Sequence, residues 1–217
     1  TLEGPSGHAL IQINEKGQNC IVVYGGTNVQ LTRPYIDGVL EHFGAGDFLI
    51  LQNEINEVPY IMEQAHGRGM TVVFNPSPIT SMLCQEYPLE FVDYFILNEI
   101  EGAALSGGGA SNQEILEGLH QRFPHAAIVL TVGEQGVLYA HGKQRLSRGI
   151  YSVPVVDTTA AGDTFCGYFV ASMAQGLSVE EGLRRASAAS AMAVSVMGAA
   201  PSIPTQSQVQ AFLEDRG

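Results

Sequence analysis

The strongest signal in the sequence is the stretch Val155-Val-Asp-Thr-Thr-Ala-Ala-Gly-Asp-Thr-Phe-Cys-Gly167. This stretch starts like a strand, continues through small residues and leads into a helix predicted over residues 163–175. The small side chains leave the backbone uncovered at the helix start, where unpaired N–H groups and the positive end of the helix dipole attract an anion. Asp163 lies at the same place and could accept a proton from an attacking hydroxyl. An arbitrary Asp in a first helical turn would only favour the dipole.

Outward from this stretch, short apolar runs alternate with helical patterns. Strands are predicted over residues 8–14, 20–24, 48–51, 71–74, 94–97, 127–130 and 136–139, and helices over 32–43, 58–65, 113–123, 163–175 and 178–198, with a further helix through Leu105. This alternation predicts an α/β fold with a three-layer, doubly wound, mostly parallel sheet. Ligands of such sheets bind outside the carboxyl ends of the strands, which singles out the loops after Leu97, after Leu130 and ahead of Asp163.

The composition is that of a globular chain of 217 residues, one large domain or two small ones. Hydrophobic residues make up 45% of the chain and charged residues 15%, which excludes a disordered protein. The net charge of −12 excludes a general nucleic-acid binder, because most of the surface would repel a phosphate backbone. Any bound phosphate must therefore be held locally, by backbone N–H groups at a helix start.

The sequence gives no sign of membrane association. No apolar stretch reaches membrane-spanning length, and no signal peptide is visible at Thr1. The cysteines, Cys20, Cys84 and Cys166, form no C-x-x-C pair, so we expect reduced thiols in a cytoplasmic protein. The histidines show no metal-ligand spacing.

Further segments accompany the stretch around Asp163: Ser6-Gly-His-Ala-Leu10, Leu51-Gln-Asn-Glu54, Asn75-Pro-Ser-Pro78, Asn98-Glu-Ile-Glu101, Thr131-Val-Gly-Glu-Gln-Gly136 and Gly198-Ala-Ala-Pro-Ser202. With the string Ala160-Ala-Gly-Asp-Thr-Phe165, they resemble the ribokinase family of sugar kinases, the phosphofructokinase-B type. Each segment alone is a modest signal, whereas all of them in the family's order over nearly the whole chain are a strong one. The resemblance implies a ribokinase-like fold.

The resemblance also implies a role for each matching residue. Asp163 would be the general base that activates the sugar hydroxyl, and the N–H groups of Ala160, Ala161, Gly162 and Asp163 would form an anion hole for the transferring phosphoryl group. The implied nucleotide-binding residues are Asn98, Thr131, Val132, Gly133, Glu134, Gln135, Gly136, Gly162, Asp163 and Ser187. Thr-x-Gly-x-x-Gly is weak by itself, since glycine turns after strands are common. Ser187 fits a contact with adenine and a small residue on a packed helix about equally.

Metal and sugar sites are implied in the same way. Asn98 and Glu101, three residues apart and hence on one helix face, would organise Mg²⁺ through water. A helix cap is the alternative for Asn98, and both roles can hold together. A monovalent cation, usually potassium in relatives, would be surrounded by Asp157, Thr159, Ala193, Val196, Gly198 and Ser202. Glu54 would bind sugar hydroxyls together with Asp163, and a solvated loop acid is the competing interpretation of Glu54.

The resemblance departs from the family pattern at the start of the chain. Family members usually begin with a strand, a sugar-binding Asp and a Gly-Gly-x-x-x-Asn loop, whereas Gly25-Gly-Thr-Asn28 matches a later element. We therefore expect residues 1–217 to be the C-terminal portion of a kinase domain, without its N-terminal strands and most of its lid. Residues 1–28 would be strands next to the lid, through which a homodimer could form. On this interpretation the chain alone would bind sugar weakly.

The function that the resemblance implies is ATP-dependent phosphorylation of a small sugar at a primary hydroxyl, with D-ribose giving ribose 5-phosphate as the first choice. ATP, Mg²⁺ and K⁺ would be the cofactors. Alternatives within the fold are kinases for fructose, 2-keto-3-deoxygluconate or adenosine. An alternative of another class is a non-catalytic, nucleotide-binding fragment.

Overall fold

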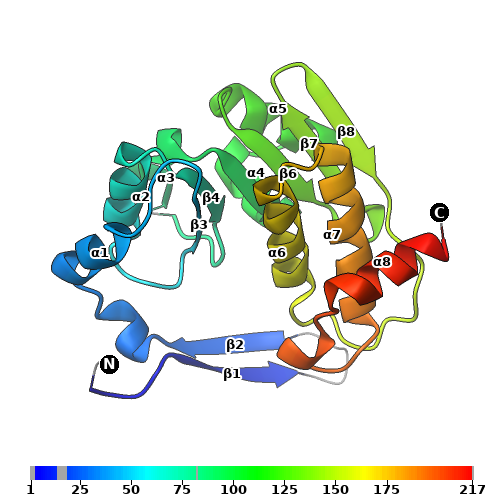
Figure 1. The fold of residues 1–217 in the computed structure, drawn as a ribbon, viewed down its shortest axis with the longest axis horizontal. Coiled ribbons are helices and arrows are strands. Elements are labelled where there is room, and N and C mark those ends of the chain that lie inside the picture. Colours follow the sequence, from blue (N-terminus) through cyan, green and yellow to red (C-terminus); the bar gives the residue numbers. More distant parts are fainter. Residues whose placement is uncertain (1–2, 14–18, 82, 217) are drawn as a thin grey trace. The chain divides into compact units, whose positions relative to one another are not determined.

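The computed structural model describes residues 3–13, 19–81 and 83–216. It divides into two compact units, Thr1–Val92 and Asp93–Gly217 (Figure 1). Asn14, the last residue of the first predicted strand, lies outside the described residues. None of the helices in the described ranges is long and apolar enough to span a membrane.

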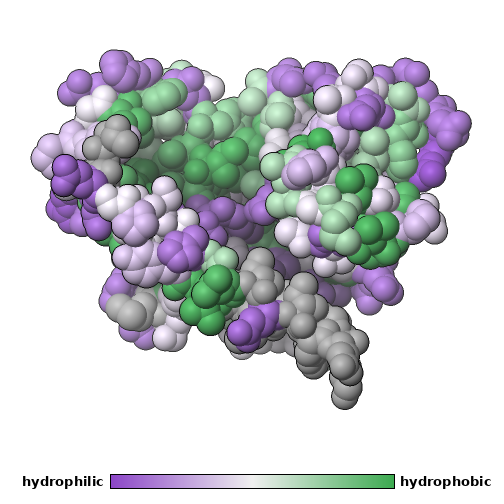
Figure 2. All heavy atoms as spheres, turned by 90° about the horizontal axis from the view of Figure 1, so that it is seen from below, coloured by the Kyte–Doolittle hydropathy of each residue, from purple (hydrophilic) through white to green (hydrophobic). Residues whose placement is uncertain are grey.

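The first unit opens with an antiparallel ribbon of β1 (His8–Ile13) and β2 (Asn19–Tyr24). Leu10 pairs with Val22 across the ribbon, and these side chains are 65% and 58% exposed. Figure 2 shows hydrophobic side chains at the surface among hydrophilic ones on one face of the molecule. Because a two-stranded ribbon alone is marginally stable in water, its apolar side chains favour contact with a further surface.

The rest of the first unit is a strand–helix–strand arrangement with short flanking helices. Its elements are η1 (Gly26–Val29), α1 (Arg33–Leu40), β3 (Phe48–Gln52), α2 (Val58–Gly67), β4 (Thr71–Asn75), α3 (Leu83–Glu86) and η2 (Leu89–Phe91). β3 and β4 are parallel, as predicted, with α2 as the connection between them. α2 buries one face, formed by Val58, Ile61, Met62 and Ala65.

The second unit holds the strands β5 (Tyr94–Asn98), β6 (Ala127–Thr131), β7 (Val137–His141) and β8 (Gln144–Arg148), in that order. Its helices are α4 (Glu99–Ser106), α5 (Asn112–Arg122), η3 (Gly133–Gln135), α6 (Ala161–Ala174), α7 (Val179–Val194), η4 (Ala200–Ser202) and α8 (Gln206–Glu214). β5 and β6 are parallel, whereas β7 is antiparallel to β6 and β8 to β7. The strand predicted over residues 136–139 is therefore present, as an antiparallel neighbour of β6. The turn 132–136 is too short for the crossover that a parallel neighbour needs.

Helices cover both faces of this sheet. Tyr94 contacts Phe169 of α6 with the ring centroids 6.1 Å apart, and Phe95 contacts Phe123 at the end of α5 at 4.6 Å. Neighbouring residues of a strand point to opposite faces, so α5 and α6 lie on opposite sides of β5. The second unit therefore has the predicted three layers (Figure 1).

The layer of α6, α7 and α8 carries residues 155–167, the stretch that contains Asp163. Alanines on α7 are fully buried, which lets α6 and α8 approach it closely. Ala188 and Ala189 form one core cluster with Val209 and Leu213 of α8. α6 begins at Ala161, slightly before the predicted start at residue 163, and α7 ends at Val194, before the predicted end at residue 198.

Candidate active site

The start of α6 is built from backbone alone. Ala160 is the N-cap residue, in a left-handed conformation with φ 59° and ψ 11°, and its side chain makes no capping hydrogen bond. The Ala161 amide donates to the Thr158 carbonyl at 3.3 Å. This amide already has an acceptor, so fewer of the predicted amides remain for an anion. A Cβ added to Gly162 would meet no atom within 4 Å. The open space beside Gly162 therefore fits an anion at the positive end of the helix.

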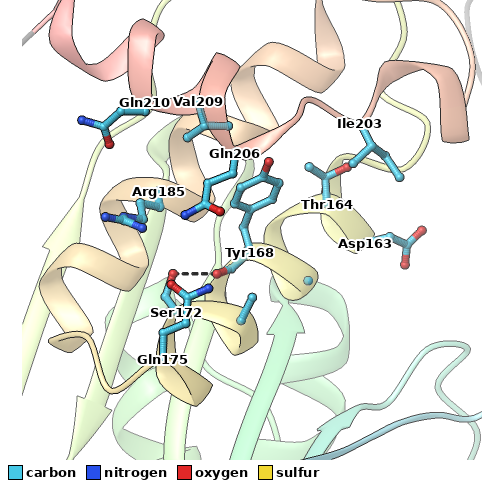
Figure 3. Close-up of a pocket in the computed structure, with 12 residues that line it drawn as sticks. Asp163, Thr164, Tyr168, Ser172, Gln175, Arg185, Ile203, Gln206, Val209 and Gln210 are labelled. Carbon is cyan, nitrogen blue, oxygen red and sulfur yellow. Dashed lines mark hydrogen bonds between the residues drawn. The ribbon is translucent and has the colours of Figure 1, made fainter.

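Asp163 is exposed in the first turn of α6, at the edge of a groove of about 340 Å³ between α6 and α8 (Figure 3). Tyr168 forms one wall of the groove, and its hydroxyl donates to the Pro204 carbonyl at 2.6 Å. Ser172 Oγ donates to the Tyr168 carbonyl at 2.7 Å. These bonds fix the groove wall and leave the carboxylate of Asp163 reachable, as a general base must be.

The side chains that follow Asp163 on α6 are buried. Burial, together with the negative charge of Asp163, raises the pKa of the Cys166 thiol to about 11. The thiol therefore stays protonated at neutral pH and does not compete as a nucleophile. Thr164 is 3% exposed, and its Oγ1 has no hydrogen-bond partner within the described part of the chain.

The loop ahead of α6 is tied to the end of α7. Asp157 Oδ1 accepts from the Thr159 amide, and Oδ2 accepts from the Gly198 amide, both at 2.9 Å. The amides of Val156 and Asp157 both donate to the Val194 carbonyl, at 2.8 and 3.1 Å. Hydrogen bonds from the Thr159 side chain, the Thr159 amide and the Gly198 amide lower the pKa of the Asp157 carboxyl below its ordinary value. Asp157 therefore remains ionised between two loops that the sequence assigned to one cation site.

The predicted nucleotide loop begins at the carboxyl ends of the parallel strands. Asn98 and Thr131 are register partners there, and Thr131 Oγ1 donates to the Leu97 carbonyl at 3.3 Å. The turn that follows is closed by the Val132 amide, which donates to the Gly136 carbonyl at 2.8 Å. The loops after β5 and β6 therefore lie side by side, at the edge where a ligand of this fold is expected.

Asn98 and Glu101 form a capping box. Asn98 is the N-cap of α4, and its Oδ1 accepts from the Ile100 and Glu101 amides, both at 2.9 Å. Glu101 Oε2 in turn accepts from the Asn98 amide at 3.0 Å, and Glu101 is 5% exposed. The helix-cap interpretation of Asn98 is therefore confirmed, whereas the expected shared helix face is wrong because Asn98 is the last residue of β5 and precedes α4. Among the described residues, no cluster of three or more His, Cys, Asp and Glu side chains could hold a metal ion.

The remaining predicted residues are spread over both units. Ser187 is 9% exposed among the alanines of α7, which favours the packing interpretation over a contact with adenine. Ala193 is buried, Val196 is 44% exposed, and Ser202 Oγ donates to the Ala199 carbonyl at 2.7 Å. Glu54 belongs to the first unit and is exposed.

Two features of the site had no counterpart in the sequence analysis. The groove wall from Tyr168 to Gln210 depends on α8, a helix that the sequence analysis did not predict. Ser190 of α7 donates its hydroxyl to the Ala161 carbonyl at 3.0 Å. The only signal for this bond was a hydroxyl within a run of alanines.

An exposed carboxylate beside an anion-attracting helix start suits group transfer from a nucleotide, with the nucleotide lying along the neighbouring strand ends. The fold and site thus define an α/β phosphotransferase.

Comparison with known proteins gives the family. Residues 2–206 match the pfkB family of carbohydrate kinases, and the chain belongs to that family. Ribokinase from Staphylococcus aureus is 32% identical over 216 residues, covering 96% of this chain and 70% of the relative. The structure of a Cryptococcus neoformans ribokinase in complex with ADP matches with a TM-score of 0.85 and 30% identity, covering 97% of this chain and 72% of that one. An Arabidopsis thaliana ribokinase complexed with ribose and ATP matches with a TM-score of 0.81 and 28% identity, covering 98% and 70%. These matches confirm the predicted ribokinase-like fold and sugar-kinase class.

Proposed function

We propose that this chain transfers the terminal phosphoryl group of ATP to the primary hydroxyl of D-ribose, giving ribose 5-phosphate. The observation that carries the proposal is the exposed Asp163 carboxylate beside the open backbone at Gly162, at the positive end of a 14-residue helix. Support for ribose comes from relatives named ribokinase, which are 32% identical to this chain.

In this proposal, Asp163 accepts the proton of the sugar hydroxyl as that hydroxyl attacks phosphorus. The Gly162 amide and the helix dipole face the charge that develops on the transferring group. This local field matters because the chain as a whole has a net charge of −12. Thr131 and residues 132–136 would lie along the nucleotide, since their turn extends the edge of β6.

Mg²⁺ fits Asn98 and Glu101 only through its own waters. The Asn98 side-chain oxygen already accepts from two amides, and the Glu101 carboxylate is buried within the capping box. Mg²⁺ retains several waters in most nucleotide sites, so a water-bridged ion agrees with these bonds. When bound, the ion would neutralise charge on the nucleotide phosphates.

K⁺ fits the place where the loop ahead of α6, at Asp157, is bonded to the loop after α7, at Gly198. The Asp157 carboxylate accepts hydrogen bonds from the Thr159 amide, the Thr159 side chain and the Gly198 amide, which leaves one of its roughly four acceptor sites for a cation. Thr159, Ala193, Val196, Gly198 and Ser202 could add carbonyl or hydroxyl oxygens, the ligands that hard cations prefer. We propose this site for a monovalent cation that steadies the loop ahead of α6.

The β1–β2 ribbon is our candidate for a homodimer interface, because Leu10 and Val22 expose apolar surface on the same side of paired strands. Leu10→Lys combined with Val22→Lys should convert a dimer to a monomer in size-exclusion chromatography with light scattering. A monomeric wild type, or a dimeric double variant, would contradict this interface. The free thiols of Cys84 and Cys166 are in keeping with work in the cytoplasm.

The decisive experiment measures sugar-dependent ADP release by direct chromatography, up to high sugar concentration. Ribose should be the best substrate in a panel with deoxyribose, fructose, 2-keto-3-deoxygluconate and adenosine. Asp163→Asn should retain nucleotide binding and lose about 10²-fold or more in turnover. Asp215→Asn, at the exposed end of α8, is the matched control and should behave as wild type.

Three other results would contradict parts of this proposal. ADP release that is independent of any sugar would exclude a sugar kinase, and nucleotide binding without turnover would favour the non-catalytic alternative. Equal rates in sodium-only and potassium buffers would contradict the cation site at Asp157.

A further inference from the structure

One hydroxyl of the alanine-rich helix α7 is aimed at the start of α6. Ser190 is half-buried, and its Oγ donates to the Ala161 carbonyl at 3.0 Å. Its neighbours Ala188, Ala189 and Ala191 are buried against the adjoining helices. Ser190 thus links α7 to the start of α6 by a hydrogen bond.

The Ala161 carbonyl and the Gly162 amide belong to the same peptide group. That group is planar, so its carbonyl and its N–H point in fixed, opposite directions. A bond that holds the Ala161 carbonyl therefore also sets the direction of the Gly162 N–H. This is the amide beside the open space at the positive end of α6.

The start of α6 needs such support because its own residues supply little. Ala160 has a left-handed backbone that a residue with a Cβ adopts rarely, and it provides no side-chain cap. The Ala161 amide is bonded to Thr158 within the same loop. Ser190, by contrast, reaches the helix start from a second, well-packed helix.

We propose that Ser190 is a positioning residue for phosphoryl transfer, which orients the peptide between Ala161 and Gly162 so that its N–H meets the transferring group. This inference rests on the proposed function of the α6 start. It adds a residue to that function outside the motif stretch that carries Asp163.

The test compares three variants of the complete chain. Ser190→Ala removes the hydroxyl, and Ser190→Thr retains it. Ser195→Ala is the matched control, because Ser195 is the C-cap residue of α7 and its hydroxyl donates to the Met192 carbonyl, at 2.7 Å, and not to α6. Ser190→Ala should lower kcat about three- to ten-fold, with KM for the sugar changed less than two-fold, since one hydrogen bond of about 1 kcal/mol corresponds to roughly five-fold in rate. Ser190→Thr should recover at least half of the lost rate, and Ser195→Ala should match wild type.

A role limited to packing would give a different pattern. Equal kcat values for Ser190→Ala and Ser195→Ala would overturn the proposal, as would a raised KM with unchanged kcat. Failure of Ser190→Thr to recover any rate would also overturn it.

Amide hydrogen exchange provides a readout that does not depend on turnover. In a regular helix the Phe165 amide donates to the Ala161 carbonyl, and the Thr164 amide donates to the Ala160 carbonyl at 2.9 Å. Both amides should exchange at least three-fold faster in Ser190→Ala and at the wild-type rate in Ser195→Ala. This result would support the link to Ala161 even if no sugar were phosphorylated, in which case the proposed function alone would fail. Unchanged exchange in Ser190→Ala would overturn the link itself.

Discussion

Replacing Gly136 by Ala should destabilise the second unit far more than replacing Gly133, although both glycines belong to the predicted nucleotide loop. Gly136 has φ 96° and ψ −120°, a backbone conformation that is essentially limited to glycine. A Cβ at this position would overlap the Arg148 carbonyl oxygen and would lie 2.9 Å from the Gly149 carbonyl carbon. Both are backbone atoms, so no side-chain rotation relieves the overlap.

Two effects would destabilise Gly136→Ala: an unfavourable backbone conformation and an atomic overlap. The backbone conformation costs about 1–3 kcal/mol for a residue with a Cβ, and forcing atoms into a packed region costs about 1–3 kcal/mol more. The overlap would also separate β7 from β8 where Val137 pairs with Arg148. Gly133 has φ 53°, and its added Cβ would meet only Glu99 Oε1, at an ordinary 3.7 Å. Its replacement therefore costs about 1–2 kcal/mol, from the left-handed backbone alone.

Urea unfolding followed by far-ultraviolet circular dichroism measures the difference. With a slope of about 2 kcal/mol per molar urea, Gly136→Ala should unfold about 1 M or more below Gly133→Ala. Gly133→Ala should remain folded and should bind ADP more weakly than wild type in a nucleotide titration. Equal urea midpoints for the two variants would refute this reasoning, because the backbone conformation and the overlap with Arg148 should together penalise Gly136→Ala more than Gly133→Ala.

Three further predictions concern stability and thiol chemistry. Asn98→Ala should lose about 1 kcal/mol of unfolding free energy, measured by urea titration, because it removes the cap of α4, and Asn98→Asp should keep most of it. The hydrogen bond from Arg184, followed by that from Arg185, lowers the pKa of the Glu181 carboxyl to about 2. The resulting stability is present above the ordinary pKa and lost as the pH falls from about 4.5 towards 2, so the midpoints of wild type and Glu181→Gln should converge over that range. Iodoacetamide at pH 8 should label Cys84 well before Cys166 in peptide mass maps, because a thiol with a pKa of about 11 is only about 0.1% thiolate there.

Sequence patterns predict a strand or helix correctly where its buried residues also follow the period of that element. The strands at 94–98 and 127–131 are continuous apolar runs with buried interiors, and the structure has both within one or two residues of their predicted ends. The helix predicted over residues 163–175 is also present and begins two residues earlier, at Ala161.

Local sequence patterns do not predict the elements that form through tertiary contacts. β8 is polar and mostly exposed, so its residues show no alternation, and it forms because β7 offers an edge one tight turn away. The spacing of Asn98 and Glu101 suggested a shared helix face, yet it is equally the spacing of a capping box. Only the direction of the chain at Asn98 separates the two, and that direction depends on where β5 ends.

The proposed function requires an acidic chain to hold a phosphoryl group, and the two aspartates near the start of α6 bear on how it could do so. Asp157 lies close to the helix start, and an uncompensated carboxylate there would oppose a nucleotide. Its two oxygens instead accept the Thr159 and Gly198 amides, so its charge is spent on fixing the loop. Asp163 stays exposed at the groove edge, where a hydroxyl can reach it. On the proposed function, the two carboxylates thus serve different purposes: Asp157 fixes the loop, and Asp163 would accept a proton. On the proposed function, anion binding therefore falls to the Gly162 amide, and the hydrogen bond from Ser190 to the Ala161 carbonyl would set the direction of that amide.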